Sequence, residues 1–463
     1  MAERVPTTAL SMIIIFITFA YRRPRGSLVT ALQLVVADHV AGRLYVYDPY
    51  AGRLLARLDG RHLAEHAGFL RLSGGRVAFV DDLAGEVVVL DPVAPGEGRP
   101  LVAATAPVAV PAEHIAADPT GRHLAVTTGC GRSWEPWSDL TTVVDLAPER
   151  PYAPRESGGH RPRAVRVRTR VDEPGVVLLG TDDPLVVLRH RMPGALAAHR
   201  LHDLLDAGPG CPRAEPYERL LFPGDGHGDA VDPTAERLFT ATGAGVHRAR
   251  RDGRTLTAES PLSWDTAGRG GGRGYYLRLD PRGRVLWSTV RVDTTGPERW
   301  PEWPNDAWWH HLDSGRTGRV ELGPGLVFRL ALAAGRAAFT RIHPDGDELI
   351  LLNTGTGPVP SASPRTAAAD GPSVAARLAL PPMNGAPRRG GTPWDGVQRR
   401  AVAASPGGDL VAVTRGGHGE IHIVDASTGV LRHTIRTPTP LDEGGHLALT
   451  GTEDGAEADT VGR

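Results

Sequence analysis

The sequence predicts an all-β protein built from a repeating unit of four antiparallel strands. Three observations support this prediction: a recurring turn motif, a recurring hairpin motif, and the spacing of these motifs along the 463 residues. Self-similarity at a roughly fixed interval is the sequence signature of repeat architectures. Each motif accounts for one part of the repeat.

The turn motif supplies the first half of the unit. Five segments follow the pattern x-P-x-G, a polar pair and an apolar run, with Ala235 replacing the glycine in the second segment. Proline after a polar residue, with glycine two positions later, is typical of a tight turn, and the Val/Leu-rich run suits a buried strand. Half a β-hairpin is therefore predicted in each of Asp118–Gly129, Asp232–Gly243, Asp280–Val290, His343–Gly355 and Ser405–Gly416.

The hairpin motif supplies the second half. Its order is strand, aspartate, turn, glycine, strand, and a short aspartate can accept hydrogen bonds from the backbone of such a turn while glycine adopts a positive φ. We expect third and fourth strands at Arg43–Leu58, Glu86–Gly96, Trp309–Leu322 and Glu420–Ile435.

The spacing combines both halves into blades. Prolines at 119, 174, 233, 281, 344 and 406 recur every 48 to 63 residues, which is typical of a single β-propeller with four-stranded blades. The predicted blades lie near residues 68–104, 110–155, 163–205, 227–258, 273–323, 325–381 and 397–437.

The two ends of the repeat region complete one further blade. Residues 32–58 offer strands two to four without a first strand, whereas His446–Thr452 (HLALTGT) resembles a first strand without successors. Pairing of these segments would close the ring and remove an exposed sheet edge. The count is therefore eight blades, with seven as the alternative.

The segments IHIVDASTGVL and LYVYDPYAGRL, together with the x-P-x-G strands, allow a comparison with known families. The chain resembles YVTN-type and WD-repeat-like bacterial β-propellers over nearly all of residues 32–452. Related propellers include lactone hydrolases, heavy subunits of quinone dehydrogenases, metal chaperones and scaffolds. The resemblance implies a fold, and function must be argued from the loops.

The regions outside the repeats are distinct in composition. Residues 1–27 form an apolar and basic extension before the propeller of 28–452, and the apolar run at 9–21 is short for a membrane span and lacks a clear cleavage site. We expect a cytoplasmic protein, with export or membrane anchoring through 9–21 as the alternative. A mobile insertion is predicted at about 358–396 and an acidic tail at 453–463.

Composition excludes several functions. All 52 basic residues are arginine, so chemistry that needs a lysine amine is excluded. The net charge of −1 provides no global field to attract nucleic acid, and no nucleic-acid partner is expected. Two cysteines exclude a disulfide scaffold and a four-thiolate zinc site, and leave the redox state of Cys130 and Cys211 open.

Candidate metal ligands come from the strands expected to line the central channel. The candidates are His114, His227, His446, Glu113, Asp225 and Asp229. Aligned repeats place the three histidines at one level, where an acid could complete a zinc or copper shell. The arrangement, with the ADH tripeptide at 37–39, resembles periplasmic zinc-carrying propellers. The alternative is a water-filled channel whose histidines bond water and acids.

A second histidine pattern has the wrong context. Residues His62–His66 match H-x-x-E-H, in which a long helix presents two zinc-binding histidines and a glutamate base. About ten residues separate the flanking predicted strands, too few for that helix. We therefore interpret the match as coincidental.

Candidate ligand-binding residues are mainly aromatic. They are Trp300, Trp303, Trp308, Trp309, Trp134 and Trp137, with Arg168, Tyr276 and Arg329 from the predicted channel. Clustered aromatic rings beside acids can stack on sugars, aromatic rings or cations. The alternative is that these rings pack between blades.

These observations favour a noncatalytic binding or scaffold propeller that recognises a protein or small-molecule ligand through its loop face. One alternative is an extracytoplasmic zinc- or copper-binding propeller. Another is a metal-dependent, lactonase-like hydrolase or a quinone-dehydrogenase-type subunit. The sequence contains no G-x-S-x-G nucleophile elbow and no recognisable cysteine–histidine motif. A membrane partner is expected only if residues 9–21 form an anchor.

Overall fold

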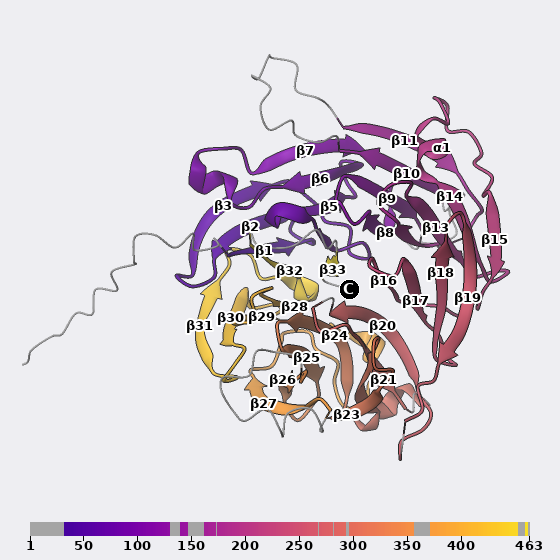
Figure 1. The fold of residues 1–463 in the computed structure, drawn as a ribbon. Helices are drawn as coiled ribbons and strands as arrows, with labels where there is room; N and C mark the ends of the chain where they lie inside the picture. Colours follow the sequence, from indigo (N-terminus) through magenta and orange to yellow (C-terminus); the bar gives the residue numbers. More distant parts are fainter. Residues whose placement is uncertain are drawn as a thin grey trace, which may run out of the picture. The chain divides into compact units, whose positions relative to one another are not determined.

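A computed structural model describes most of the chain. The described residues are 32–129, 139–146, 162–172, 174–266, 268–280, 282–292, 296–355, 371–451 and 459–461. They form eight antiparallel sheets arranged as the blades of a β-propeller (Figure 1). No helix among the described residues is both long enough and apolar enough to cross a bilayer. The segment 9–21 lies outside them, so the compartment stays a prediction.

In each blade the strands follow one another from the innermost outward. Blade 1 contains β32 (His446–Thr450), β1 (Gln33–Asp38), β2 (Arg43–Asp48) and β3 (Arg53–Asp59). Blade 2 contains β33 (Asp459–Val461), β4 (Phe69–Arg71), β5 (Val77–Asp81), β6 (Glu86–Leu90) and β7 (Val102–Pro107). Blade 3 contains β8 (Ala112–Ala117), β9 (His123–Thr128), β10 (Leu140–Asp145) and β11 (Arg163–Arg168). Blade 4 contains β12 (Gly175–Leu179), β13 (Leu185–His190), β14 (Ala195–Arg200) and β15 (Glu218–Leu221).

The other four blades have the same order. Blade 5 contains β16 (Asp229–Asp232), β17 (Arg237–Ala241), β18 (Val246–Asp252) and β19 (Thr255–Leu262). Blade 6 contains β20 (Arg273–Asp280), β21 (Val285–Arg291), β22 (Pro304–His311) and β23 (Thr317–Pro324). Blade 7 contains β24 (Leu326–Ala333), β25 (Arg336–Ile342), β26 (Asp347–Asn353) and β27 (Ser373–Leu380). Blade 8 contains β28 (Val402–Ala404), β29 (Leu410–Arg415), β30 (Glu420–Asp425) and β31 (Leu431–Arg436).

Short helices occur only in the connections of the described chain. They are α1 (Leu201–Leu205) and the 3-10 helices η1 (Ser73–Gly75), η2 (Ala94–Glu97), η3 (Pro297–Glu302), η4 (Pro393–Asp395) and η5 (Asp442–Gly444). β27 and η4 fall within the segment predicted as an insertion, and β27 is the outermost strand of blade 7.

Apolar packing between adjacent blades forms the core. Side chains alternate across a strand, so β1 directs Leu34 and Val36 into a cluster with blade 8, and Val35 and Ala37 into a cluster with blade 2. A strand covered on both faces is apolar at consecutive positions, which explains the run LVVA within β1. Neighbouring inner strands contact one another around the whole ring; in blade 2 the strand that makes these contacts is β4, which contacts β32 and β8.

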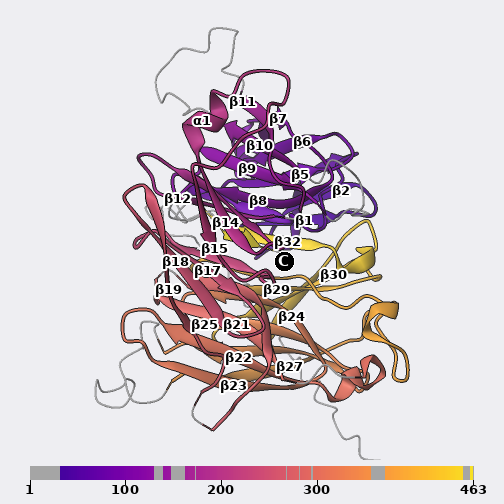
Figure 2. The same ribbon diagram turned by 90° about the vertical axis from the view of Figure 1, so that its right-hand side faces the viewer.

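The two ends of the repeat region, β1 and β32, share blade 1, as the sequence predicts. β32 pairs antiparallel with β1, with Val35 opposite Ala448 and Ala37 opposite His446. Figures 1 and 2 show the yellow β32 beside the indigo β1. The prediction of eight blades is confirmed.

Two details of the predicted repeats are wrong. Residues 163–168 (RAVRVR) do not open a blade but form β11, the outermost strand of blade 3. Three arginines among apolar residues suit an exposed outer strand, whereas the fully apolar GVVLL of β12 suits the innermost position. The turn at 343–346 lies between β25 and β26, because an earlier turn at 334–335 already joins the first two strands of blade 7.

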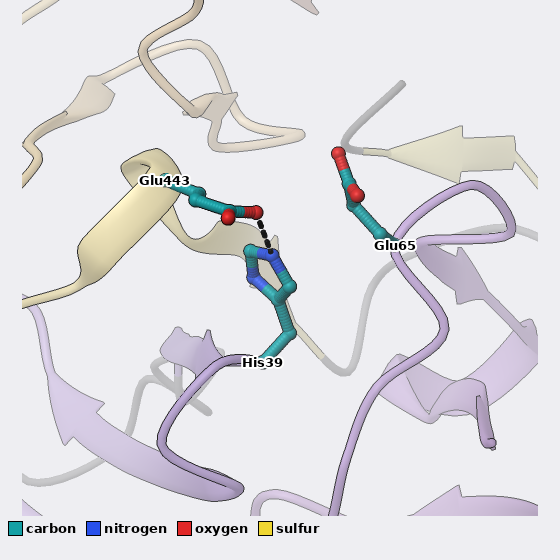
Figure 3. Close-up of side chains that lie close together, drawn as sticks. All are labelled: His39, Glu65 and Glu443. Atoms are coloured by element: carbon teal, nitrogen blue, oxygen red, sulfur yellow. Dashed lines mark hydrogen bonds and ion pairs between the residues drawn. The ribbon is translucent and has the colours of Figure 1, made fainter. Parts of the chain in front are cut away.

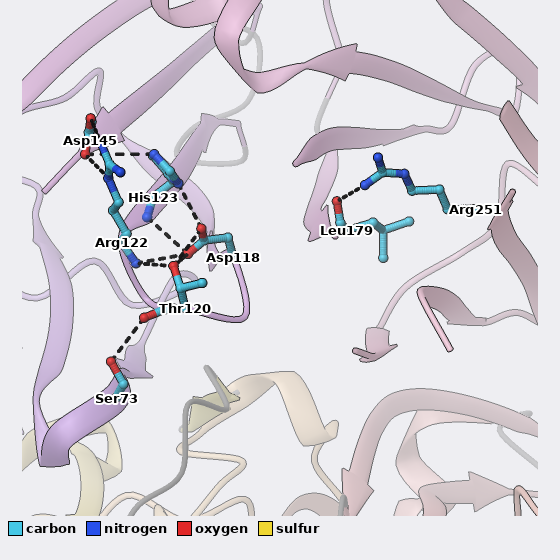
Figure 4. A network of polar contacts seen from close by, with 8 residues as sticks. All are labelled: Ser73, Asp118, Thr120, Arg122, His123, Asp145, Leu179 and Arg251. Carbon is cyan, nitrogen blue, oxygen red and sulfur yellow. Dashed lines mark hydrogen bonds and ion pairs between the residues drawn. The ribbon is translucent and has the colours of Figure 1, made fainter. Parts of the chain in front are cut away.

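The buried aspartate explains the turn motif at 118–121. Asp118 accepts hydrogen bonds from the backbone N–H and the Nδ1 of His123, at 3.1 and 2.8 Å, and from the Thr120 hydroxyl (Figure 4). Burial opposes ionisation, but these hydrogen bonds hold the pKa of Asp118 below its ordinary value. The Ser73 hydroxyl donates to the Thr120 carbonyl at 3.1 Å, which ties the turn to blade 2.

Candidate metal centre

One imidazole and two carboxylates converge on the face of the propeller that carries the connections between blades. We call this face the connection face. His39 lies in the turn between β1 and β2, Glu65 in the connection from β3 to β4, and Glu443 in η5 before β32 (Figure 3). One ligand atom from each lies within 4.8 Å of the others. Nε2 of His39 and Oε2 of Glu443 form a hydrogen bond of 3.2 Å.

Asp38 holds two of these loops together. Its buried carboxylate accepts the backbone N–H of Ala41 at 2.9 Å and that of Leu441 at 3.0 Å. The first bond shapes the turn that carries His39, and the second fixes the start of the segment that carries Glu443. The side chain of His62 joins the third loop to the same turn, because its Nδ1 lies 3.3 Å from the His39 carbonyl oxygen.

The electrostatics of the cluster favour a cation. Burial lowers the pKa of His39 below its ordinary value, and the positive charge of Arg399 lowers it further. The hydrogen bond to Glu443 raises this pKa but does not offset the effect of burial. The imidazole is therefore neutral near pH 7, which is the form that binds metals. Glu65 forms an ion pair with Arg399, so two carboxylates and one guanidinium leave a net negative charge.

The donor set fits a transition-metal ion. Zinc accepts imidazole nitrogen and carboxylate oxygen, and sites with three protein ligands keep a position for water or an exchanging group. The side chains of Glu65 and Glu443 are 36% and 58% exposed, so solvent reaches the cluster. Such a site permits reversible binding more readily than a closed site with four ligands.

The structure brings the predicted His114 and Glu113 together, with His66 as an additional partner. Buried Glu113 lies 3.9 Å from Nε2 of His114 and 3.2 Å from Nδ1 of His66. The buried His446 lies beside the cluster, with its ring centroid 5.1 Å from that of His39 and nearly perpendicular to it. His227 instead packs against Tyr275 and Tyr276.

Among the described residues, the three predicted histidines share no group of ligand atoms within 4.8 Å. The two predicted aspartates have structural partners. Asp229 accepts hydrogen bonds from Arg189 at 2.8 and 2.9 Å and from the Thr240 hydroxyl at 2.7 Å. Asp225 accepts the backbone N–H of Gly243 at 2.7 Å. Arg189 thus neutralises the carboxylate of Asp229, and the Asp225 bond joins two loops.

The predicted tryptophan surface is instead interior packing. Trp300, Trp303, Trp308 and Trp309 are all buried. Trp308 meets Trp264 edge to face at 5.0 Å. The last two of the four belong to β22, whose two faces are covered by neighbouring blades, so they do not stack on a ligand at the surface. Trp134 and Trp137 lie outside the described residues.

The remaining predicted binding residues separate into two groups. Arg168 ends the outermost strand β11 and pairs with Asp139 at 3.3 Å, so it does not line the channel. Tyr276 and Arg329 lie on the innermost strands β20 and β24, as predicted. Arg329 is buried.

The cluster was not predicted from the sequence, although parts of it stood out there. Residues His62–His66 form no helix, as expected from their context, yet a carboxylate oxygen of Glu65 in this segment lies within 4.8 Å of a ring nitrogen of His39. The ADH tripeptide contains both His39 and the aspartate that positions it. The missing signal was the proximity of three loops, which follows from closure of the ring.

Asp82, which lies near Asp81, His66 and Glu113, provides a pH-dependent prediction. Burial raises the pKa of Asp82 to about 6, and the negative charges of Asp81 and Glu113 contribute to the increase. A hydrogen bond from the Ala112 N–H acts in the opposite direction and lowers this pKa. The folded state therefore binds this proton more tightly than the unfolded state, and stability falls as the pH rises from about 4 to 6. We expect Asp82→Asn, which keeps the acceptor for Ala112, to stabilise the protein by about 1–3 kcal/mol at pH 7 and by much less below pH 4.

Urea unfolding at both pH values measures this effect. The exposed Asp252→Asn is the matched control and is expected to change stability little at either pH. An equal effect of Asp82→Asn at pH 4 and pH 7 would contradict the assignment.

Comparison with known proteins adds evidence on the fold. No model of a known protein family matches the chain, and no curated protein matches it. The structure of apo AztD from Citrobacter koseri is similar, with a TM-score of 0.59 and 14% identity over 93% of this chain and 100% of that chain. The dihydro-heme d1 dehydrogenase NirN in complex with DHE has a TM-score of 0.52 and 16% identity over 90% of this chain and 74% of that chain.

The WD40 domain of SCAP from fission yeast has a TM-score of 0.50 and 12% identity over 84% of this chain and 92% of that domain. The likeness is one of fold. A β-propeller with WD40-like neighbours is thus confirmed, while the YVTN-type assignment stays a prediction.

Proposed function

We propose that the protein is a noncatalytic, metal-binding β-propeller that holds one divalent transition-metal ion at His39, Glu65 and Glu443. The observation that carries the proposal is the convergence of one imidazole and two carboxylates within 4.8 Å. His39 and Glu443 are 404 positions apart in the sequence. The proteins with a similar fold include a dehydrogenase and a WD40 domain. The fold alone therefore does not indicate which function this protein has.

Zinc is the ion that we expect first. Imidazole and carboxylate ligands suit zinc, and copper(II) binds the same donors at least as tightly by the general order of divalent metals. Two carboxylates offset the charge of the ion, and neutral His39 offers a nitrogen lone pair. Arg399 is expected to leave Glu65 when the ion binds, because a guanidinium and a metal compete for the same oxygen atoms.

A binding role suits the geometry of the cluster. Its residues come from loops on a closed frame, and Asp38 and His62 fix the loops relative to one another. Exposed Glu443 and partly exposed Glu65 give an ion a path to and from solvent. These features support uptake and release of an ion at the connection face.

Metal content tests the proposal. Untagged protein purified without chelator is loaded with zinc or copper, desalted and analysed by mass spectrometry. We expect one ion per chain in the wild type, and affinity reduced at least about 100-fold in the variant His39→Ala/Glu65→Gln/Glu443→Gln.

The matched control removes imidazoles elsewhere. His114→Ala/His227→Ala changes two residues outside the cluster and should retain the ion. An ion that persists in the cluster variant, or the absence of any ion in the loaded wild type, would refute the proposal.

A further inference from the structure

A second candidate site lies at the seam between blades 3 and 4, away from the metal cluster. A cleft open to solvent is lined by charged and polar side chains, chiefly Arg170, His190, His199, Arg213, Glu215 and Arg219. Blade 4 contributes the floor, and the connection from α1 to β15 contributes a wall.

Strand register explains why this seam is hollow. His190 pairs with Ala195 and Val186 pairs with His199, so alternate side chains of β13 and β14 face blade 3 together. The alanine side chains at 195 and 197 are small and leave space between the two imidazoles. The wall is fixed because Ala214 donates its backbone N–H to the Arg168 carbonyl at 2.8 Å.

The wall already binds a carboxylate. Oε1 of Glu215 accepts a hydrogen bond from Nε of Arg213 at 2.8 Å, and Oε2 accepts one from Arg219 at 3.1 Å. These two cations, first of all Arg213, hold the pKa of Glu215 below its ordinary value. Glu215 therefore shows that two arginines here can share one carboxylate, which is the recognition geometry typical of arginine.

The floor carries two buried imidazoles, and one ring nitrogen, Nδ1 of His190, has no hydrogen-bond partner in the described part of the chain. His190 and His199 are each 3% exposed. Nδ1 of His190 makes no hydrogen bond to any described residue, and its nearest carboxylate oxygen, from Asp172, is 3.6 Å away. Burial, with the nearby His190 and Arg219, lowers the pKa of His199 to about 4. A buried polar group without a partner is costly, so an acceptor placed in the cleft would be favourable.

We propose that this cleft binds a small anion carrying a carboxylate or phosphate group. The anion takes the place of Glu215 on Arg213 and Arg219 and accepts a hydrogen bond from an imidazole of the floor. Arg170 pairs with Asp172 at 3.4 Å and adds a third guanidinium to the lining. Glu215 acts as an internal competitor that limits affinity.

Calorimetric titration with succinate and with inorganic phosphate, in separate experiments on metal-free protein, tests the proposal. Glu215→Gln should tighten binding about tenfold because the competitor loses its charge. Arg213→Gln and Arg219→Gln should each weaken binding about tenfold or more. Arg389→Gln, which changes an exposed arginine paired with Asp345, is the control and should have no effect.

The two probes distinguish the ligand class, since binding of only one identifies a carboxylate or a phosphate as the preferred group. Anion binding should also raise the pKa of His199 in an NMR titration. The proposal is overturned if Glu215→Gln shows no saturable binding at millimolar concentrations of both anions. It is also overturned if the variants Arg213→Gln and Arg219→Gln bind as tightly as the wild type.

Discussion

Deletion of residues 442–463 is expected to abolish cooperative folding of the propeller. This deletion removes β32, whose five residues are all buried and which supplies the innermost strand of blade 1. Leu447 and Leu449 lie in the cluster with blade 8, and Ala448 lies in the cluster with blade 2. Burial of each leucine contributes about 1.5–3 kcal/mol, which together with the lost strand pairing is comparable to a typical total stability of about 5–15 kcal/mol.

A shorter deletion is the control. Removal of residues 452–463 keeps β32 and, of the described strands, loses β33, a three-residue strand that pairs with β4. We expect this variant to unfold cooperatively in thermal and urea melts followed by circular dichroism, with a small loss of stability. If both deletions melt like the full chain, ring closure by β32 does not stabilise the fold.

Replacement of Arg400 by methionine is expected to cost about 3–5 kcal/mol of unfolding free energy. The guanidinium is fully buried, and its Nε donates to Oδ2 of Asp347 at 2.9 Å. A further N–H donates to the Thr414 carbonyl at 3.0 Å. Burial lowers the pKa of Arg400, and the ion pair with Asp347 opposes this effect. Methionine fills much of the space but leaves the carboxylate buried without its cation.

The double variant Arg400→Met/Asp347→Asn separates charge from packing. Neutralising the carboxylate should restore at least about 1 kcal/mol relative to the single variant in urea unfolding. The control Arg389→Met breaks an exposed ion pair with Asp345 and should cost less than about 1 kcal/mol. Equal costs for Arg400→Met and Arg389→Met would show that burial of the pair has no effect.

The blades are predictable because their signals are local. A turn such as DPTG and the apolar strand behind it adjoin in sequence, and Asp118 satisfies the backbone within five residues of itself. Closure of the ring is also predictable. The strand at 446–450 resembles the first strand of a blade but has no further strands after it, so it needs the partner that β1 supplies. Residues 163–168 were predicted to begin a blade, although they form the outer strand β11 of blade 3. The connection from β10 to β11 is longer than a usual turn, and no proline of the repeat shows where β11 begins.

The candidate site is less predictable because it depends on contacts between distant loops. His39 and Glu443 adjoin only because the chain closes on itself, and local pattern carries no information on that proximity. The tryptophans show the opposite error. Their density in the sequence suggests an exposed loop, but Trp308 and Trp309 belong to a strand between two blades, where large rings fill the interior.

Anomalous diffraction at the zinc absorption edge, from crystals of the zinc-loaded protein, tests the proposed metal centre most directly. We predict one strong peak bonded to His39, Glu65 and Glu443, and loss of that peak in crystals of the variant His39→Ala/Glu65→Gln/Glu443→Gln. A peak at Glu113, His114 or elsewhere, or no peak in zinc-loaded crystals, would contradict the proposal.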